Sequence, residues 1–211
     1  MWPYKLIASQ IRKPSGTIGK MIGYGMARGH RRLYDWTIDL MDVQPTDHVL
    51  DVGCGNGKVV GLIAGISTEG FVAGIDYSKD MVQSARKLNA DEIRSGHVEI
   101  VHSNVSAMLY EDESFDKVCA IETFYFWPDP VLNLEEVWRV LKPGGSVFIA
   151  MEMSKETTNQ QKAALWAARL DLRCFSGVEM EEMLTEAGFG RTWFKTARED
   201  EWGWICAVGV R

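Results

Sequence analysis

The sequence predicts an α/β fold built on a doubly wound, mostly parallel seven-stranded sheet, with an antiparallel C-terminal strand pair and a helical cap. Between residues 48 and 151, short apolar runs alternate with segments of helical spacing, a pattern typical of repeated strand–helix units. The runs are apolar at nearly every position, so we expect both faces of the sheet to be covered. The 211 residues are enough for one domain with appendages.

The N-terminal region has a different pattern. Glycines recur from Gly16 to Gly29, and each costs a helix interior about 1 kcal/mol relative to alanine. We therefore predict an irregular or mobile arm over the first 30 residues, followed by a helix at Arg31–Met41 that ends before Pro45. The predicted division is an N-terminal arm with a cap helix at 1–44 and a main domain at 45–211.

The alternating part of the chain contains five predicted strands. Pro and Gly in Lys142-Pro143-Gly144-Gly145 predict a sharp break between the last helix and the last of these strands. The predicted strands are His48–Val52, Phe71–Ile75, His97–His102, Lys117–Ile121 and Ser146–Met151, and helices are predicted near Lys58–Ile66, Lys79–Leu88 and Val131–Leu141.

The C-terminal part departs from this alternation. A predicted helix at Thr157–Leu172 lies within a cap insertion at 153–175, and a second helix at Val178–Ala187 ends at Gly188. Two strands follow, Thr192–Thr196 and Trp204–Val210. Their connection is only about seven residues, too short for a parallel crossover, so we predict an antiparallel pair.

Composition and charge exclude several classes of protein. The chain has no apolar run long enough to span a membrane and no signal-peptide layout at its start, so we expect a cytoplasmic protein. The net charge of −6 disfavours general binding to nucleic acid, although residues 1–34 carry seven Lys or Arg and no acid. The four cysteines form no C-x-x-C pair and the four histidines show no metal-ligand spacing, so no metal is predicted.

The most informative segment is a glycine-rich loop between a strand and a helix, from Asp51 to Gly57. A dinucleotide fingerprint would place a third glycine at Lys58, and a phosphate-binding P-loop would require Ser or Thr at Val59, so both patterns fail. The acid at the strand end would repel a pyrophosphate but attract the ammonium group of an amino-acid-like ligand. A purely structural turn is the alternative.

A second acid, Asp76, ends the next strand about 20 residues beyond the loop, where a carboxylate can accept hydrogen bonds from ribose hydroxyls. Asp76 could instead cap the following helix, a role for which Ser78 competes. Together the two acids and the glycine loop fit adenosine with an amino-acid tail, which describes S-adenosylmethionine.

Four segments in order give the chain a family resemblance. Residues 47–152 resemble the class I S-adenosylmethionine-dependent methyltransferases, in particular the small-molecule group that includes ubiquinone and menaquinone biosynthesis enzymes. The resemblance implies a Rossmann-like fold and an enzyme of EC class 2.1.1. The matching segments are Val49-Leu50-Asp51-Val52-Gly53-Cys54-Gly55-Asn56-Gly57, Gly74-Ile75-Asp76-Tyr77-Ser78, Asp112-Glu113-Ser114-Phe115-Asp116-Lys117-Val118 and Arg139-Val140-Leu141-Lys142-Pro143-Gly144-Gly145.

The resemblance also implies roles for individual residues. Asn104 stands where the family usually has an Asp that binds the adenine amino group, and its carbonyl can still accept that bond. Glu122 would lie beside the methionine part and the transferable methyl, as a cofactor contact, a substrate contact or a solvated acid. The implied cofactor residues are Asp51, Gly53, Cys54, Gly55 and Gly57 for the methionine part, Asp76 for the ribose, Tyr77, Met81, Asn104 and Val105 for the adenine, and Glu122.

An aromatic segment, Phe124–Trp127, leaves the fourth strand at the end of the sheet where ligands bind. It could shape a substrate pocket or pack against the helix that follows. Candidate substrate residues are Tyr24, Tyr125, Trp127 and Trp166. A hydroxyl or amine nucleophile requires a base, for which Glu122 or a histidine of the cap are candidates.

These observations predict a methyltransferase that uses S-adenosyl-L-methionine, releases S-adenosyl-L-homocysteine and methylates a small molecule by in-line displacement. Two other functions stay open: a protein or RNA methyltransferase, and an inactive protein that binds S-adenosylmethionine. The acidic main domain and the lack of an added binding domain disfavour the first of these.

Overall fold

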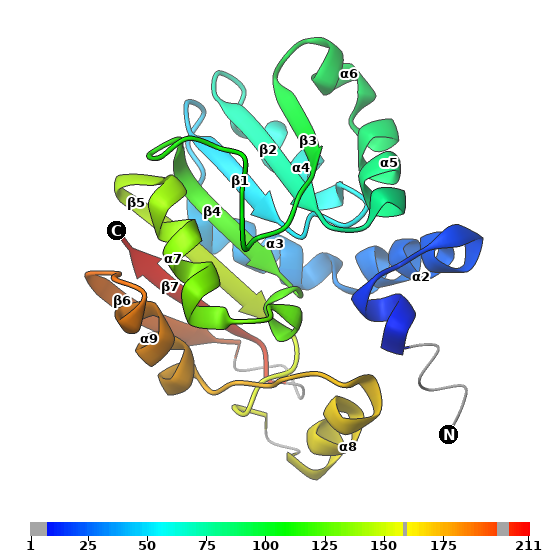
Figure 1. Ribbon diagram of the computed structural model, residues 1–211, viewed down its shortest axis with the longest axis vertical. Helices are drawn as coiled ribbons and strands as arrows, with labels where there is room; N and C mark the ends of the chain where they lie inside the picture. Colours follow the sequence, from blue (N-terminus) through cyan, green and yellow to red (C-terminus); the bar gives the residue numbers. More distant parts are fainter. Residues whose placement is uncertain (1–7, 158–159, 198–202) are drawn as a thin grey trace.

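The computed structural model describes residues 8–157, 160–197 and 203–211 and confirms the predicted fold class. Seven strands form one sheet in the order β3-β2-β1-β4-β5-β7-β6 (Figure 1), in which β7 runs antiparallel to both β5 and β6. The strands are β1 (His48–Val52), β2 (Phe71–Asp76), β3 (Val98–His102), β4 (Phe115–Ile121), β5 (Leu141–Met151), β6 (Arg191–Thr196) and β7 (Ile205–Val210).

Neighbouring residues of a strand point to opposite faces of the sheet, and here both sets are apolar. Helices therefore cover both faces. On one face, Val49 of β1 packs with α3 (Arg31–Met41), α4 (Lys58–Ala64) and α5 (Lys79–Leu88). On the other face, Leu50 packs with residues of α7 (Pro130–Val140) and α9 (Gly177–Glu186). The sheet therefore lies between two apolar cores, one on each face, which hold the carboxyl ends of its parallel strands in place.

The N-terminal segment is the main difference from the sequence prediction. Gly16–Gly29 forms helix α2, so the prediction of an irregular arm was wrong over these residues; residues 1–7 lie outside the described chain. Contacts with the domain offset the cost of the glycines, since α2 packs against α5 and the backbone N–H of Gly16 donates to Asp80 at 2.9 Å. Gly19 has no room for a side chain, because a Cβ there would lie 2.7 Å from the backbone carbonyl carbon of Pro14.

Smaller differences occur at short elements. β5 begins at Leu141, directly after α7, so the predicted break at 142–145 lies inside the strand as a change of register against β4. The helix α6 (Ala90–Arg94) and the 3-10 turn η1 (Phe124–Phe126) were not predicted. The helix of the predicted cap insertion is α8 (Gln160–Leu170), which lies with α2 beyond the carboxyl ends of the parallel strands (Figure 1).

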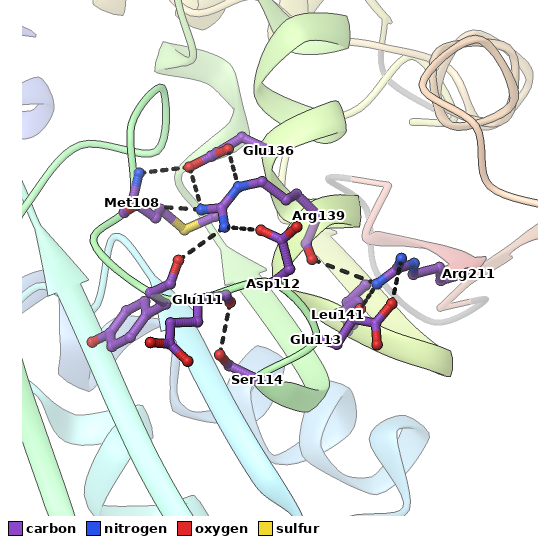
Figure 2. A network of polar contacts seen from close by, with 10 residues as sticks. Met108, Glu111, Asp112, Glu113, Ser114, Glu136, Arg139, Leu141 and Arg211 are labelled. Carbon is purple, nitrogen blue, oxygen red and sulfur yellow. Dashed lines mark hydrogen bonds and ion pairs between the residues drawn. The ribbon is translucent and has the colours of Figure 1, made fainter.

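A polar network around Arg139 fixes the loop that leads into β4 (Figure 2). The guanidinium of Arg139 donates to Glu136 and Asp112, each at 2.7 Å, while Glu136 accepts the backbone N–H of Met108 at 2.8 Å. The guanidinium holds the pKa of Glu136 below its usual value. The network joins α7 to residues 108–112 on the face of the sheet away from α4.

The described helices include none that is long and apolar enough to cross a membrane.

Candidate active site

A cavity of about 310 Å³ opens at the carboxyl ends of β1, β2 and β4. Ten of the eleven predicted cofactor residues line it; the exception is Gly57, the residue before α4, which packs against Ala85 and Asn89. Residues of the N-terminal segment complete the wall, among them Arg12, His30 and Tyr34. The ten lining residues are Asp51, Gly53, Cys54, Gly55, Asp76, Tyr77, Met81, Asn104, Val105 and Glu122.

The glycine loop requires glycine at Gly53. Its φ of 79° lies in the left-handed region, and a Cβ there would lie only 2.4 Å from Cγ2 of Thr123. The backbone N–H groups of Gly53 and Cys54 both donate to the carbonyl of Ile75, which ties the loop to the end of β2. At Gly55, with a φ of 53°, a Cβ would meet no atom within 4 Å, so a ligand can approach the backbone there.

Asp51 is a buried carboxylate at the end of β1, and its Oδ2 atom has no hydrogen-bond partner among the described residues. Its other oxygen accepts the thiol of Cys119 at 3.6 Å. Burial raises the pKa of Asp51 to about 7. A buried carboxylate oxygen without a partner, on a residue that lines a cavity, fits a cationic group of a ligand, such as an ammonium.

Asp76 connects the glycine loop to α5. One carboxylate oxygen accepts the N–H of Gly55 at 2.9 Å and the other accepts the N–H of Ser78 at 2.7 Å. Burial raises the pKa of Asp76, while the two backbone hydrogen bonds oppose that rise. The side chain of Ser78, rather than Asp76, caps α5 by accepting the N–H of Met81 at 3.4 Å.

The N-terminal segment contacts the residues that follow β2 at the wall of the cavity. The hydroxyl of Tyr77 donates to the carbonyl of Arg12, and the hydroxyl of Ser78 donates to the carbonyl of Pro14 at 2.6 Å. Asn104 accepts the N–H of Ser106 at 3.2 Å, which leaves the second lone pair of its carbonyl for a ligand. The predicted adenine residues therefore line the same cavity as Ile11, Arg12 and Pro14.

A cluster of His30, Glu122 and Glu152 lies where β4 and β5 end. Glu122 has a φ of 62° and accepts the hydroxyl of Tyr125 at 2.9 Å and the backbone N–H of Glu152. Burial raises the pKa of Glu122. Burial lowers the pKa of His30, but the hydrogen bond to Glu152 and the charge of Glu122 outweigh it and give a net rise.

The predicted substrate residues are only partly brought together. Trp127 lines the cavity, with Phe126 and Pro128 of the same segment. Tyr125 is only 3% exposed and does not line it, and Trp166 of α8 packs against the core instead. The side chain of Tyr24 lies outside the described part of α2.

Sequence reasoning missed most of the N-terminal contribution to the site. His30, Tyr34, Arg12 and Ile11 line the cavity although no sequence motif marks them. The available signal was the boundary at Gly29-His30, where a glycine separates two helices and places a polar side chain between them. Arg31, another basic residue of this segment, does not line the cavity and pairs with Asp35 at 2.8 Å.

A glycine loop, a buried acid without a partner among the described residues and a second acid on the next strand lie together at the carboxyl ends of a parallel sheet, which is where ligands bind in such sheets. Residues 50–149 match the family model described as a methyltransferase domain. This part of the chain is therefore similar to the class I S-adenosylmethionine-dependent methyltransferases.

Relatives of known name agree with this assignment. A demethylmenaquinone methyltransferase of Bacillus cereus is 35% identical over 129 residues, which cover 61% of this chain and 54% of that protein. The O-methyltransferase resE of Aspergillus sclerotiorum is 32% identical over 156 residues, covering 72% of this chain and 58% of that protein. The chain thus spans little more than half the length of these curated relatives.

The fold likeness extends further than the sequence likeness. The protein solved in complex with the Haloferax volcanii Trm112 methyltransferase activator has a TM-score of 0.76. The match has 24% sequence identity and covers 89% of this chain and 92% of that chain. At this identity the likeness concerns the fold alone.

Proposed function

We propose that this protein transfers a methyl group from S-adenosylmethionine to a small-molecule acceptor. The observation that carries the proposal is the unpartnered Oδ2 of Asp51, buried at the wall of the cavity beside the glycine loop. A cationic ligand group at this atom would compensate a buried charge that no described residue compensates.

The remaining cavity residues fit the other parts of the cofactor. Gly53 and Gly55 present backbone rather than side chains to the methionine part, as a close approach requires. Asp76 would accept hydrogen bonds from the ribose, and Asn104 one from the adenine amino group. Tyr77, Met81 and Val105 would flank the adenine ring. When bound, S-adenosylmethionine would supply a methyl group whose carbon a nucleophile attacks opposite the sulfonium sulfur, with S-adenosylhomocysteine as the leaving group.

The protein's main contribution is to hold nucleophile and methyl group in line, which can be worth up to about 7–11 kcal/mol. Trp127, Phe126 and Tyr34 give the cavity an aromatic wall for the acceptor. Glu122 is the candidate acceptor of a proton from a hydroxyl or amine nucleophile. Residues 1–44 and the insertion at 153–175 form the proposed cap over the acceptor, with α2 and α8 on either side (Figure 1).

Three observations favour a small molecule over a protein or RNA acceptor. The cavity is compact, the N-terminal segment covers one end of it, and the relatives named above are a demethylmenaquinone methyltransferase and an O-methyltransferase. The acidic main domain also disfavours RNA.

Calorimetric titration tests the cofactor site. We expect saturable binding of S-adenosylmethionine and S-adenosylhomocysteine, weakened at least about tenfold in Asp76→Ala. Asp91→Ala, in the exposed helix α6, is the matched control and should bind as the wild type does. Lack of binding, or binding indifferent to Asp76→Ala, would refute the site.

Turnover tests the reaction itself. A panel of phenols, amines, thiols and carboxylates, set against bulk protein and RNA, should give methylated product only in the small-molecule arm. Product in the protein or RNA arm contradicts the proposed acceptor class. Tight cofactor binding without turnover in any arm, including extracts of small metabolites, supports an inactive binding protein instead.

A further inference from the structure

We propose that His30, Glu122 and Glu152 form a binding site for a divalent first-row transition-metal ion at the inner end of the cavity. The residues come from three places in the chain: the junction of α2 and α3, the end of β4 and the end of β5. The proposal concerns ion binding and does not depend on the proposed methyl transfer.

The spacing of the three side chains suits a single ion. Nε2 of His30 lies 3.1 Å from Oε2 of Glu152 and 3.7 Å from Oε2 of Glu122. All three donor atoms lie within 4.8 Å of one another. Two ligand atoms about 2.0–2.2 Å from one ion are about 2.8–3.6 Å apart at octahedral or tetrahedral angles, so the two distances from His30 already nearly suit a shared ion.

The charge at the cluster favours a cation. The side chains of Glu122 and Glu152 are 14% and 28% exposed, and among the described residues each forms an ion pair with His30 alone. Two poorly solvated carboxylates therefore face one imidazole, and even a protonated His30 leaves one negative charge uncompensated. A divalent ion bound by a neutral His30 would balance both carboxylates, in competition with protons.

The carboxylates are held in place and the ion can reach them. The hydroxyl of Tyr125 and the backbone N–H of Glu152 fix one oxygen of Glu122 and leave its Oε2 directed at His30. Such outer contacts orient metal ligands in known sites. His30 and Glu122 also line the cavity, so positions not filled by protein would face the space assigned to the acceptor.

The donor set selects the kind of ion. One imidazole nitrogen with two carboxylate oxygens suits Mn²⁺, Fe²⁺, Co²⁺ or Zn²⁺, whereas Mg²⁺ and Ca²⁺ prefer oxygen ligands alone. With an ion bound, Glu122 would be a ligand rather than a base, and an acceptor oxygen bound to the same ion would lose its proton more readily.

Titration of the whole untagged chain with Mn²⁺, followed by the loss of the free-ion electron paramagnetic resonance signal, tests the proposal. Mn²⁺ prefers nitrogen and oxygen ligands, which limits binding to the free cysteines. We expect one ion per chain with a dissociation constant below about 50 μM, and at least tenfold weaker binding in His30→Gln and in Glu152→Gln. Zn²⁺ should displace Mn²⁺, and Mg²⁺ should not.

Matched variants distinguish a local site from a general effect. His48→Gln and Glu111→Gln change an exposed histidine and an exposed glutamate away from the cluster and should bind Mn²⁺ as the wild type does. Circular dichroism and thermal melting of His30→Gln and Glu152→Gln should show a folded protein. No saturable Mn²⁺ binding by the wild type, or binding unchanged in both cluster variants, would overturn the proposal whether or not S-adenosylmethionine binds.

Discussion

At the scale of single residues, the buried carboxylate of Asp51 lowers the stability of the free protein, and on the proposed function it would contact the ammonium group of the cofactor. Its carboxylate is fully enclosed at the end of β1, and one oxygen has no partner among the described residues. A ligand ammonium would supply the missing contact as a charge-assisted hydrogen bond. On the proposed function, the atom that costs stability in the free protein would strengthen cofactor binding.

This predicts that Asp51→Asn weakens binding of S-adenosylmethionine by about 10- to 100-fold, since a hydrogen bond to a charged group contributes about 1.5–3 kcal/mol. In the wild type, affinity should also fall as the pH drops below about 7, because Asp51 then becomes protonated. Calorimetry between pH 6 and 8 measures both effects. Equal affinity in Asp51→Asn and the control Asp91→Asn would contradict the role of Asp51.

A second prediction separates the glycines of the loop. Gly53→Ala should reduce the free energy of unfolding by about 1–3 kcal/mol, because a positive φ and a Cβ position 2.4 Å from Thr123 both oppose a side chain. Gly55→Ala carries the strain of a positive φ but meets no neighbour, so it should lose less stability than Gly53→Ala and lose cofactor affinity. Urea unfolding and calorimetry distinguish the two effects.

The double variant Gly53→Ala, Thr123→Ser provides the check on that prediction. Serine removes the Cγ2 atom nearest the new Cβ, so part of the lost stability should return, while the strain of the positive φ remains. If Thr123→Ser brings no recovery, the crowding against Thr123 is not the cause of the loss.

At this scale the sequence predicts well which residues line the cavity beside the glycine loop, and predicts the cluster around His30 poorly. The residues beside the loop follow from a local pattern, because Asp51 to Gly57 lie in one loop and Asp76 ends the next strand. His30, Glu122 and Glu152 are far apart in the chain and meet only because β4 and β5 are neighbours in the sheet under the α2–α3 junction. No spacing rule along the chain could show that contact.

At the scale of elements, two of the four segments behind the family resemblance build scaffold rather than site. Asp112 and Arg139 join each other at 2.7 Å, and Asp116 joins Lys142 at 2.7 Å (Figure 2 shows the first pair). None of these residues lines the cavity. Their side chains fix the loop before β4 against α7 and β5.

The scaffold role predicts that Arg139→Ala lowers the free energy of unfolding by about 1–3 kcal/mol, because it removes bonds to Glu136, Asp112 and the carbonyl of Tyr110. Cofactor affinity should stay within about twofold of the wild type. Arg94→Ala, which removes an exposed ion pair with Asp91, is the control and should cost at most about 0.5 kcal/mol. A lost cofactor affinity with unchanged stability would contradict this role.

The elements also show what hydrophobic period can and cannot predict. Strands β1, β2 and β4 agree with prediction within two residues because each is a short, mostly apolar run that is largely buried. α2 was missed because its stability comes from Asp80 and α5, far away in the sequence, rather than from helix propensity. The five-residue helix α6 and the three-residue turn η1 are too short to leave a periodic signal.

At the scale of the whole molecule, the order of the strands decides where chemistry can occur. β1 and β4 are neighbours in the sheet. After β1 the chain continues to β2 on one side, and after β4 it continues to β5 on the other side, so a crevice opens at the carboxyl ends of β1 and β4. The glycine loop, Asp76 and Glu122 all follow these strands. The basic N-terminal segment, which contacts α5 through Gly16 and Asp80, then lines the crevice and completes the cavity.

Burial of acids at this crevice predicts an unusual dependence of stability on pH. The pKa of Asp51 is raised in the folded state to about 7 from its ordinary value of 3.8, so between these values the folded protein holds a proton that the unfolded chain has released. Stability therefore falls as the pH rises through this window, by up to about 1.4 kcal/mol per pH unit for one group, and no further loss from Asp51 occurs above about 7. Asp116, Glu136 and Glu179, whose pKa values are lowered, lose their contributions to stability only in more acidic solution.

Urea unfolding at several values between pH 5 and 8 should show a declining free energy of unfolding in the wild type and a flatter profile in Asp51→Asn. Identical profiles for the two proteins would mean that Asp51 is not the group that titrates, and a saturating concentration of S-adenosylmethionine should reduce the decline by keeping the carboxylate paired.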